Sequence, residues 1–352
     1  MSDNKISRNS SIEILRCILM IQIIFYHLLV HGTNGTFHQF FDNQPLPTTL
    51  IESFFLIFNM FPVDCFMIIS GYYGLNIIKG EKINIGKVLR IYIPIFFYSV
   101  TFGTIAFIHN GLPIKEYVHN FLPIYQSNYW FITCYFILML LSPFFNAFFE
   151  QFCRNKMFIC YFITIGFINY LCSNSHFSSL LGLGYNKFFT ILYCYFIGKF
   201  IKVYESKLTF SSGKSFLFFG SSFVIEYGII YLVLKITGKN LWIQLSLNSS
   251  PFTILQAIMI FLFFKKFSFQ SKFINLLGRA TFAVYLIHEN QYIRKPLYSI
   301  INGGGYKGTV KLIPYLLLAA ILVFLCCEFL EIFRLCFFEG CKRMVISLRK
   351  KR

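Results

Sequence analysis

Ten apolar runs, separated by short polar segments, constrain this chain more than any other feature of its sequence. A helix that crosses a bilayer needs about 20 apolar residues. The chain is 56% hydrophobic and only 13% charged, against about 25% charged in soluble domains. We therefore predict an all-α polytopic membrane protein with about ten transmembrane helices, forming one membrane domain over residues 1–352 with no appended soluble domain. The approximate limits of the runs are 12–31, 51–73, 88–108, 130–149, 157–172, 187–204, 215–236, 252–265, 279–300 and 312–336.

Lys and Arg residues are distributed unevenly between alternate loops. If the N-terminus is cytoplasmic, the inner segments hold 23 of these residues and the outer segments hold eight, and the loop 32–50 holds none. Because cytoplasmic loops are enriched in Lys and Arg, we predict cytoplasmic termini and a place in a bacterial-type cell membrane. The same imbalance accounts for the net charge of +18, so we expect no nucleic-acid partner.

The first run carries ionisable residues where a spanning helix is normally apolar. Eleven helical steps from Arg16 to His27 make three turns and about 20°, so both side chains share one face, about 16 Å apart along the axis. Glu13 and His31 extend this stripe in the two directions. Ionisable residues inside a membrane are costly and mark functional candidates. The structural alternatives are an Arg that reaches to the interface and a His that is hydrogen-bonded within the bundle.

The second run contains one carboxylate and a pair of small residues. Asp64 lies near the middle of the membrane and needs a partner, so we predict that it orients His27 or Arg16. Ser70 and Gly71 are small enough to let helices pack closely. Ser70 is also a candidate contact for the substrate.

Three further groups suggest binding roles. Lys87 and Arg90 stand three residues apart at the cytoplasmic start of the third run, where they either clamp phosphates or only set topology. Tyr129 and Trp130 open the fourth run as an interfacial aromatic belt or as a platform for a sugar ring. His288 places a second imidazole within the ninth run.

Taken together, these motifs resemble acyltransferase family 3, the multi-pass membrane acyltransferases that modify bacterial surface polysaccharides. The resemblance implies ten helices and assigns catalysis to Arg16 and His27, with Glu13 and Asp64 in support. Two departures concern local geometry, because relatives often have Asp at the position of Glu13 and Gly at the position of Pro62. The matching stretches follow the order of the family and are Ile12–Arg16 with His27, Val63–Gly71, Lys87 and Arg90 before Pro94, Tyr129–Phe131 before Leu141–Pro143, and Tyr285–His288.

The resemblance implies an O-acyltransferase that moves an acetyl or other short acyl group from cytoplasmic acyl-CoA to a hydroxyl of a surface polysaccharide or its lipid-linked precursor. His27 would be the general base, with acetyl-CoA as donor, glycan and membrane lipid as partners, and no metal. The CoA phosphates would be held by Arg16, Lys87 and Arg90, and the expected acceptor contacts are Tyr129, Trp130, His288 and Ser70. The alternative is a transporter or exporter that uses the charged stripe as its path, but no paired Gly/Pro-broken helices recur in the two halves.

Overall fold

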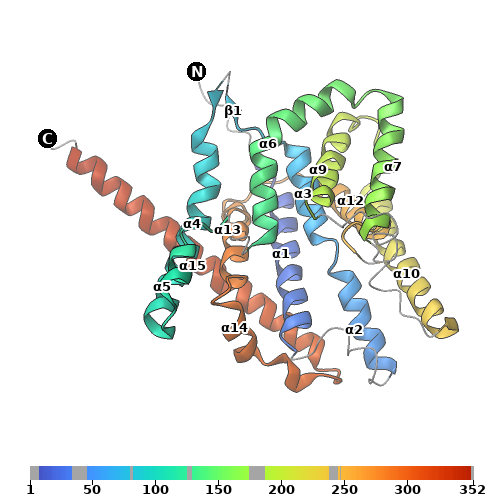
Figure 1. The fold of residues 1–352 in the computed structure, drawn as a ribbon. Helices are drawn as coiled ribbons and strands as arrows, with labels where there is room; N and C mark the ends of the chain where they lie inside the picture. Colours follow the sequence, from blue (N-terminus) through green and yellow to red (C-terminus); the bar gives the residue numbers. More distant parts are fainter. Residues whose placement is uncertain are drawn as a thin grey trace.

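The computed structural model describes residues 8–33, 46–79, 82–124, 129–173, 187–237, 245 and 247–349. Most of these residues lie in helices gathered into one bundle, with a two-stranded hairpin at one end (Figure 1). In chain order the elements are α1 (Ser10–His31), α2 (Leu46–Phe58), α3 (Pro62–Tyr73), β1 (Ile78–Lys79), β2 (Lys82–Ile83), α4 (Ile85–Asn110), α5 (Ile114–His119), α6 (Trp130–Phe152), α7 (Lys156–Ser173), α9 (Lys187–Val203), α10 (Ser212–Thr237), α12 (Pro251–Lys265), α13 (Lys272–His288), α14 (Arg294–Ile301), η2 (Gly303–Tyr306) and α15 (Leu312–Arg349).

Seven segments of the described chain are long and apolar enough to cross a membrane. They comprise α1, the α2–α3 pair, α4, α6, α7, α10 and most of α15. The other three predicted runs fall on the shorter helices α9, α12 and α13, of 17, 15 and 17 residues. The structure therefore confirms a helical multi-pass membrane protein, whereas the count of ten spans stays a prediction.

Two of the predicted spans are interrupted. The second run breaks between Phe58 and Pro62, because a proline is favoured in the first turn of a new helix but not within one. The ninth run, expected as one helix over 279–300, is also divided, since α13 ends at His288 and α14 begins at Arg294. The side chain of Asn290 accepts a hydrogen bond from the backbone of Tyr292 at 3.0 Å and stabilises this turn.

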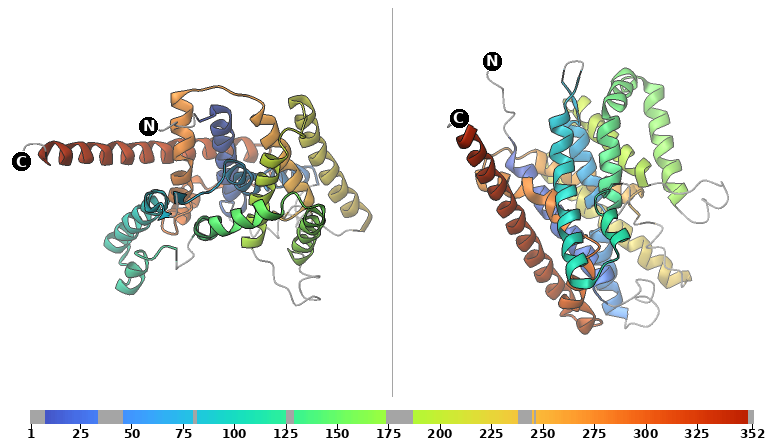
Figure 2. Two further views of the ribbon diagram at one scale, coloured as in Figure 1. Left: turned by 90° about the horizontal axis from the view of Figure 1, so that it is seen from above. Right: turned by 60° about the vertical axis from the view of Figure 1, so that its left-hand side comes forward.

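Helix α1 lies among α3, α12, α13 and α15 (Figure 1). It begins where the Asn9 side chain accepts a hydrogen bond from the Ser11 amide, and its buried leucines include Leu15 and Leu28, both 0% exposed. We call the two ends of the bundle the Ser10 end and the His31 end. Helix α15 crosses the bundle obliquely and finishes toward the Ser10 end (Figure 2). The side of the membrane on which each terminus lies stays a prediction.

Helices α3 and α9 are in backbone contact. A Cβ atom on Gly71 would collide with the carbonyl oxygen of Tyr195, and one on Gly198 would collide with that of Ile68. Glycines therefore permit the close approach, as small residues do in membrane helix pairs. This confirms the packing role predicted for Gly71, next to Ser70.

At the Ser10 end a polar clamp joins α3, α9 and α12. The ammonium groups of Lys202 and Lys265 lie 4.7 and 5.0 Å from the ring centroid of Tyr72, and both pair with Glu205, at 3.1 and 2.6 Å. Burial alone would raise the pKa of the Glu205 carboxyl, but hydrogen bonds from Lys265, Tyr72 and Lys202 lower it to about 2. The clamp fixes the end of α3, on which Ser70 lies.

Candidate active site

A pocket of about 100 Å³ lies between α1, α3, α6 and α13. Arg16, Met20, Ile23 and His27 of α1 all line it, at spacings of three, four and seven residues that place them on one helix face. The pocket therefore follows the predicted stripe from Arg16 to His27, about 16 Å along the helix axis. This confirms that the two residues share a face, and shows that the face borders a cavity.

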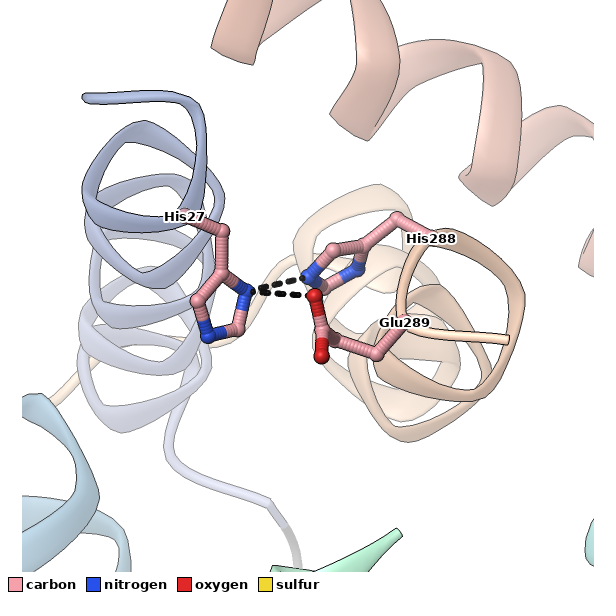
Figure 3. Close-up of side chains that lie close together, drawn as sticks. All are labelled: His27, His288 and Glu289. Atoms are coloured by element: carbon pink, nitrogen blue, oxygen red, sulfur yellow. Dashed lines mark hydrogen bonds and ion pairs between the residues drawn. The ribbon is translucent and has the colours of Figure 1, made fainter. Parts of the chain in front are cut away.

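At the His31 end of this pocket, His27 faces two side chains from the end of α13. Its Nδ1 atom lies 3.0 Å from Glu289 Oε1 and 3.3 Å from His288 Nε2 (Figure 3). The other ring nitrogen of His288, Nδ1, lies 2.7 Å from the carbonyl oxygen of Val284. Two groups from the end of α13 thus meet at one nitrogen of His27.

These contacts assign the hydrogens on both imidazole rings. A carbonyl oxygen only accepts, so His288 Nδ1 carries a hydrogen and, in the neutral ring, its Nε2 is an acceptor. Both neighbours of His27 Nδ1 are then acceptors, so this nitrogen donates a hydrogen. In the neutral His27 ring the lone pair is left on Nε2, which points away from His288 and Glu289 (Figure 3). This is the tautomer that a general base requires.

The position next to His27 belongs to Glu289, which sequence reasoning did not single out. The hydroxyl of Tyr298, on α14, donates a second hydrogen bond to Glu289 Oε1 at 3.0 Å. His288 is 1% exposed and touches His27, and its predicted contact with the acceptor stays a prediction. The sequence feature that could have identified Glu289 is its position directly after a His at the end of an apolar run.

Asp64 forms no hydrogen bond or ion pair with His27 or Arg16 among the described residues, so the prediction that it orients one of them is wrong. Its carboxyl group, 2% exposed, lies against Cys194 and Asn248, on the α9 side of α3. Residue spacing within α3 gives no information about which neighbouring helix the Asp64 side chain faces. A catalytic role for Asp64 stays a prediction.

Glu13 also faces away from the pocket. Its carboxylate pairs with Arg8 at 3.5 Å, and it packs so closely on Gly278 of α13 that a Cβ atom there would collide with it. Glu13 therefore contributes to the contact between α1 and α13, and its predicted support of catalysis remains untested by geometry.

Arg16 presents its charge to the opposite end of the pocket, where no described residue is its counter-ion. It forms no ion pair with any described residue, and its Nε atom is buried without a hydrogen-bond partner. Tyr73 and Tyr135 are close enough to feel its charge. An uncompensated guanidinium in a partly buried site favours an anionic ligand.

Two of the predicted acceptor contacts line the pocket. Trp130 does so with the ammonium of Lys187 4.5 Å from its ring centroid. Ser70 does so while its hydroxyl donates to the Phe66 carbonyl at 2.9 Å. Both remain available as predicted, on walls formed by α6 and α3.

Tyr129 has a different place from the one predicted. It is 2% exposed, its hydroxyl donates to the Leu286 carbonyl at 3.0 Å and it accepts from the Asn290 amide at 2.6 Å. These bonds hold the chain on either side of His288 and Glu289. Tyr129 therefore supports the site, and its predicted contact with a sugar stays a prediction.

Lys87 and Arg90 are exposed at the start of α4 and lie outside the pocket lining. The Lys87 ammonium donates to the Asn76 carbonyl at 2.8 Å, beside the hairpin at the Ser10 end. Their predicted role as a phosphate clamp stays a prediction.

The ligand atoms of His27, His288 and Glu289 all lie within 4.8 Å of one another, close enough to hold a metal ion. With a hydrogen on His27 Nδ1, however, that nitrogen has no lone pair for a metal. The hydrogen-bonded arrangement and a metal-bound one are therefore mutually exclusive at this atom.

Comparison with known proteins agrees with the motif pattern. A family model described as an acyltransferase domain, Acyl_transf_3, matches residues 9–331, nearly the whole chain. Neither the curated proteins nor the solved structures include a significant match.

Proposed function

The chain belongs to the Acyl_transf_3 family of acyltransferases, and from this premise we propose that it moves an acetyl group from acetyl-CoA to a hydroxyl of a surface polysaccharide or its lipid-linked precursor. The observation that carries this proposal is a pocket that joins Arg16, which has no ion-pair partner among the described residues, to His27, whose Nε2 points away from His288 and Glu289. One end suits an anionic group and the other suits proton abstraction. Acetyl is proposed as the acyl group of this reaction.

The donor enters from the Ser10 end, which the distribution of Lys and Arg assigns to the cytoplasm. Arg16 holds an anionic part of CoA at this end, because guanidinium groups bind phosphates in charge-assisted, often bidentate contacts. Lys87 and Arg90 take phosphates farther out. The pantetheine arm then follows the pocket toward His27, about 16 Å away along α1.

At the other end His27 acts as general base. The acceptor hydroxyl oxygen attacks the thioester carbonyl carbon as its proton passes to His27 Nε2, and a C–O bond forms. The C–S bond then breaks, and the thiolate of CoA takes the proton from Nε2. The products are an acetyl ester and CoA with a free thiol, and His27 returns to its starting tautomer.

Glu289 stabilises the imidazolium that forms between these two steps. Its carboxylate accepts the Nδ1 hydrogen at 3.0 Å, so the positive charge on the ring develops next to a fixed negative charge. Since this role requires the hydrogen on Nδ1, we infer that the reaction proceeds without a metal at this position.

The experiment that tests the function is deletion of the gene followed by proton NMR of the surface glycan. We expect loss of an O-acetyl signal, restored by the wild-type gene and not by Arg16→Ala. An unchanged O-acetyl signal in the deletion strain would contradict the proposal. Saturable acetyl-CoA binding, weakened in Arg16→Ala and Arg90→Ala, separates this enzyme from a transporter of glycans.

A further inference from the structure

Beyond His27, an aromatic pair continues the site toward the His31 end. His31 lies one helical turn after His27 on the same face of α1, with the two ring centroids 6.2 Å apart. Its ring stacks on that of Tyr298, with centroids 6.0 Å apart and planes 24° apart. Because the Tyr298 hydroxyl is bound to Glu289 at 3.0 Å, the pair is attached directly to the partner of the base.

His31 is exposed, and its ring nitrogens have no polar partner in the part of the chain that the structure describes. Among the described residues, none forms a hydrogen bond or ion pair with its ring nitrogens. An exposed imidazole therefore offers one aromatic face and two nitrogens to a ligand. A sugar ring has complementary features, since its C–H face packs on aromatic rings and its hydroxyls donate and accept hydrogen bonds.

The location also suits an acceptor. Fifteen helical steps, about 22 Å, separate Arg16 from His31, so the aromatic pair and the proposed anion site lie at opposite ends of α1. A donor that fills the pocket from Arg16 leaves the approach to His27 from the His31 end. Tyr129, one of the residues predicted to contact the acceptor, is buried and hydrogen-bonded to the backbone.

We propose that His31 and Tyr298 form the acceptor subsite, in which a sugar ring of the glycan packs on the exposed imidazole of His31 with a hydroxyl directed to His27. The Tyr298 ring packs on the opposite face of the His31 ring. Its hydroxyl also holds the Glu289 carboxylate by a hydrogen bond. This inference rests on the proposed acetyl transfer and adds the residues that recognise its acceptor.

The test uses membranes from cells that express each variant, with radiolabelled acetyl-CoA as donor. The acceptor probe is the surface polysaccharide and glycolipid fraction of the gene-deletion strain, treated with mild base to remove O-acetyl groups. For His31→Ala we expect the half-saturating concentration of acceptor to rise about three- to tenfold, the range for loss of one aromatic packing contact. The half-saturating concentration of acetyl-CoA should change less than about twofold.

Two companion variants separate packing from positioning. His31→Phe keeps an aromatic face and should remain closer to wild type than His31→Ala in its acceptor dependence. Tyr298→Phe keeps the ring stacked on His31 but loses the hydrogen bond to Glu289. We therefore expect the maximal rate to fall while the half-saturating concentration of acceptor stays unchanged. His109→Ala is the matched control, because His109 is an exposed histidine near the end of α4, away from the site.

The possible results are distinguishable. If wild-type membranes transfer no acetyl group to the probe, the proposed function itself is wrong. If the wild type transfers and His31→Ala matches His109→Ala in acceptor dependence, only the acceptor subsite is overturned. If His31→Ala changes only the half-saturating concentration of acetyl-CoA, the acceptor subsite is also overturned, because His31 would then act on the donor.

Discussion

The chemistry available to His27 depends on which of its two ring nitrogens carries the hydrogen. A chain of contacts decides this, from the Val284 carbonyl through His288 to His27 Nδ1. Glu289 accepts from the same nitrogen and brings a negative charge, which the neutral His288 ring does not have. Val284, His288 and Glu289 therefore determine that Nε2 of His27 carries the lone pair, although none of the three lines the pocket.

Replacing Glu289 by Gln tests the role of that charge. The amide keeps the size and an oxygen acceptor for the His27 hydrogen, but it does not stabilise an imidazolium. We expect acetyl transfer to fall about 10²- to 10⁴-fold, in the range of general-base and carboxylate contributions, with the amount of protein in the membrane unchanged. Glu116→Gln, at an exposed position on α5, is the control. Equal rates for the two variants in a radiolabelled transfer assay would remove Glu289 from the mechanism.

At the level of helices, the site depends on how closely α3 approaches α9. Gly71 touches the Tyr195 backbone, and neither backbone can move aside as a flexible side chain would. Gly71→Ala should therefore destabilise the protein by about 1–3 kcal/mol, the usual cost of overpacking. The midpoint temperature of unfolding in detergent, with the folded fraction monitored by size-exclusion chromatography, measures this effect.

Gly220→Ala is the matched variant for that measurement. Gly220 lies within α10, and apart from its chain neighbours and its own helix backbone nothing described lies within 4 Å of an added Cβ, so alanine should be tolerated or slightly stabilising. Equal midpoints for both alanine variants would show that the α3–α9 contact is not tight.

Helix-level features divide clearly into those that the sequence predicts and those that it does not. Helical periodicity placed Arg16 and His27 on one face, since this relation is internal to a single helix. The partner of His27 was assigned to Asp64 because a buried carboxylate needs a partner, but its choice among neighbouring helices depends on tertiary packing. Glu289 escaped notice because the end of α13 at His288 is set by a turn within an apolar run.

For the molecule as a whole, the open question is how many helices cross the membrane. The three shorter helices, α9, α12 and α13, decide between ten spans and fewer. They are packed among other helices, so their apolar length is a weaker guide to their placement than it is for a lipid-facing helix.

Fusions of alkaline phosphatase, which is active only outside the cytoplasm, test this topology. With ten spans we expect active fusions after Asn110 and Glu289, and inactive fusions after Val203, after Lys265 and at the C-terminus. Green fluorescent protein at the same positions should give the reverse pattern. An active phosphatase after Val203 would show that α9 does not span, and would reverse the predicted sides for the helices that follow it.

The central claim is that His27 is the base of an acyl transfer that starts from acetyl-CoA. The most direct measurement is the initial rate of radiolabelled acetyl transfer from acetyl-CoA to the de-O-acetylated surface glycan, in membranes with matched amounts of wild type and His27→Ala. We predict transfer by the wild type and, for His27→Ala, a rate at the background of membranes without the protein. A wild-type rate in His27→Ala would contradict the account.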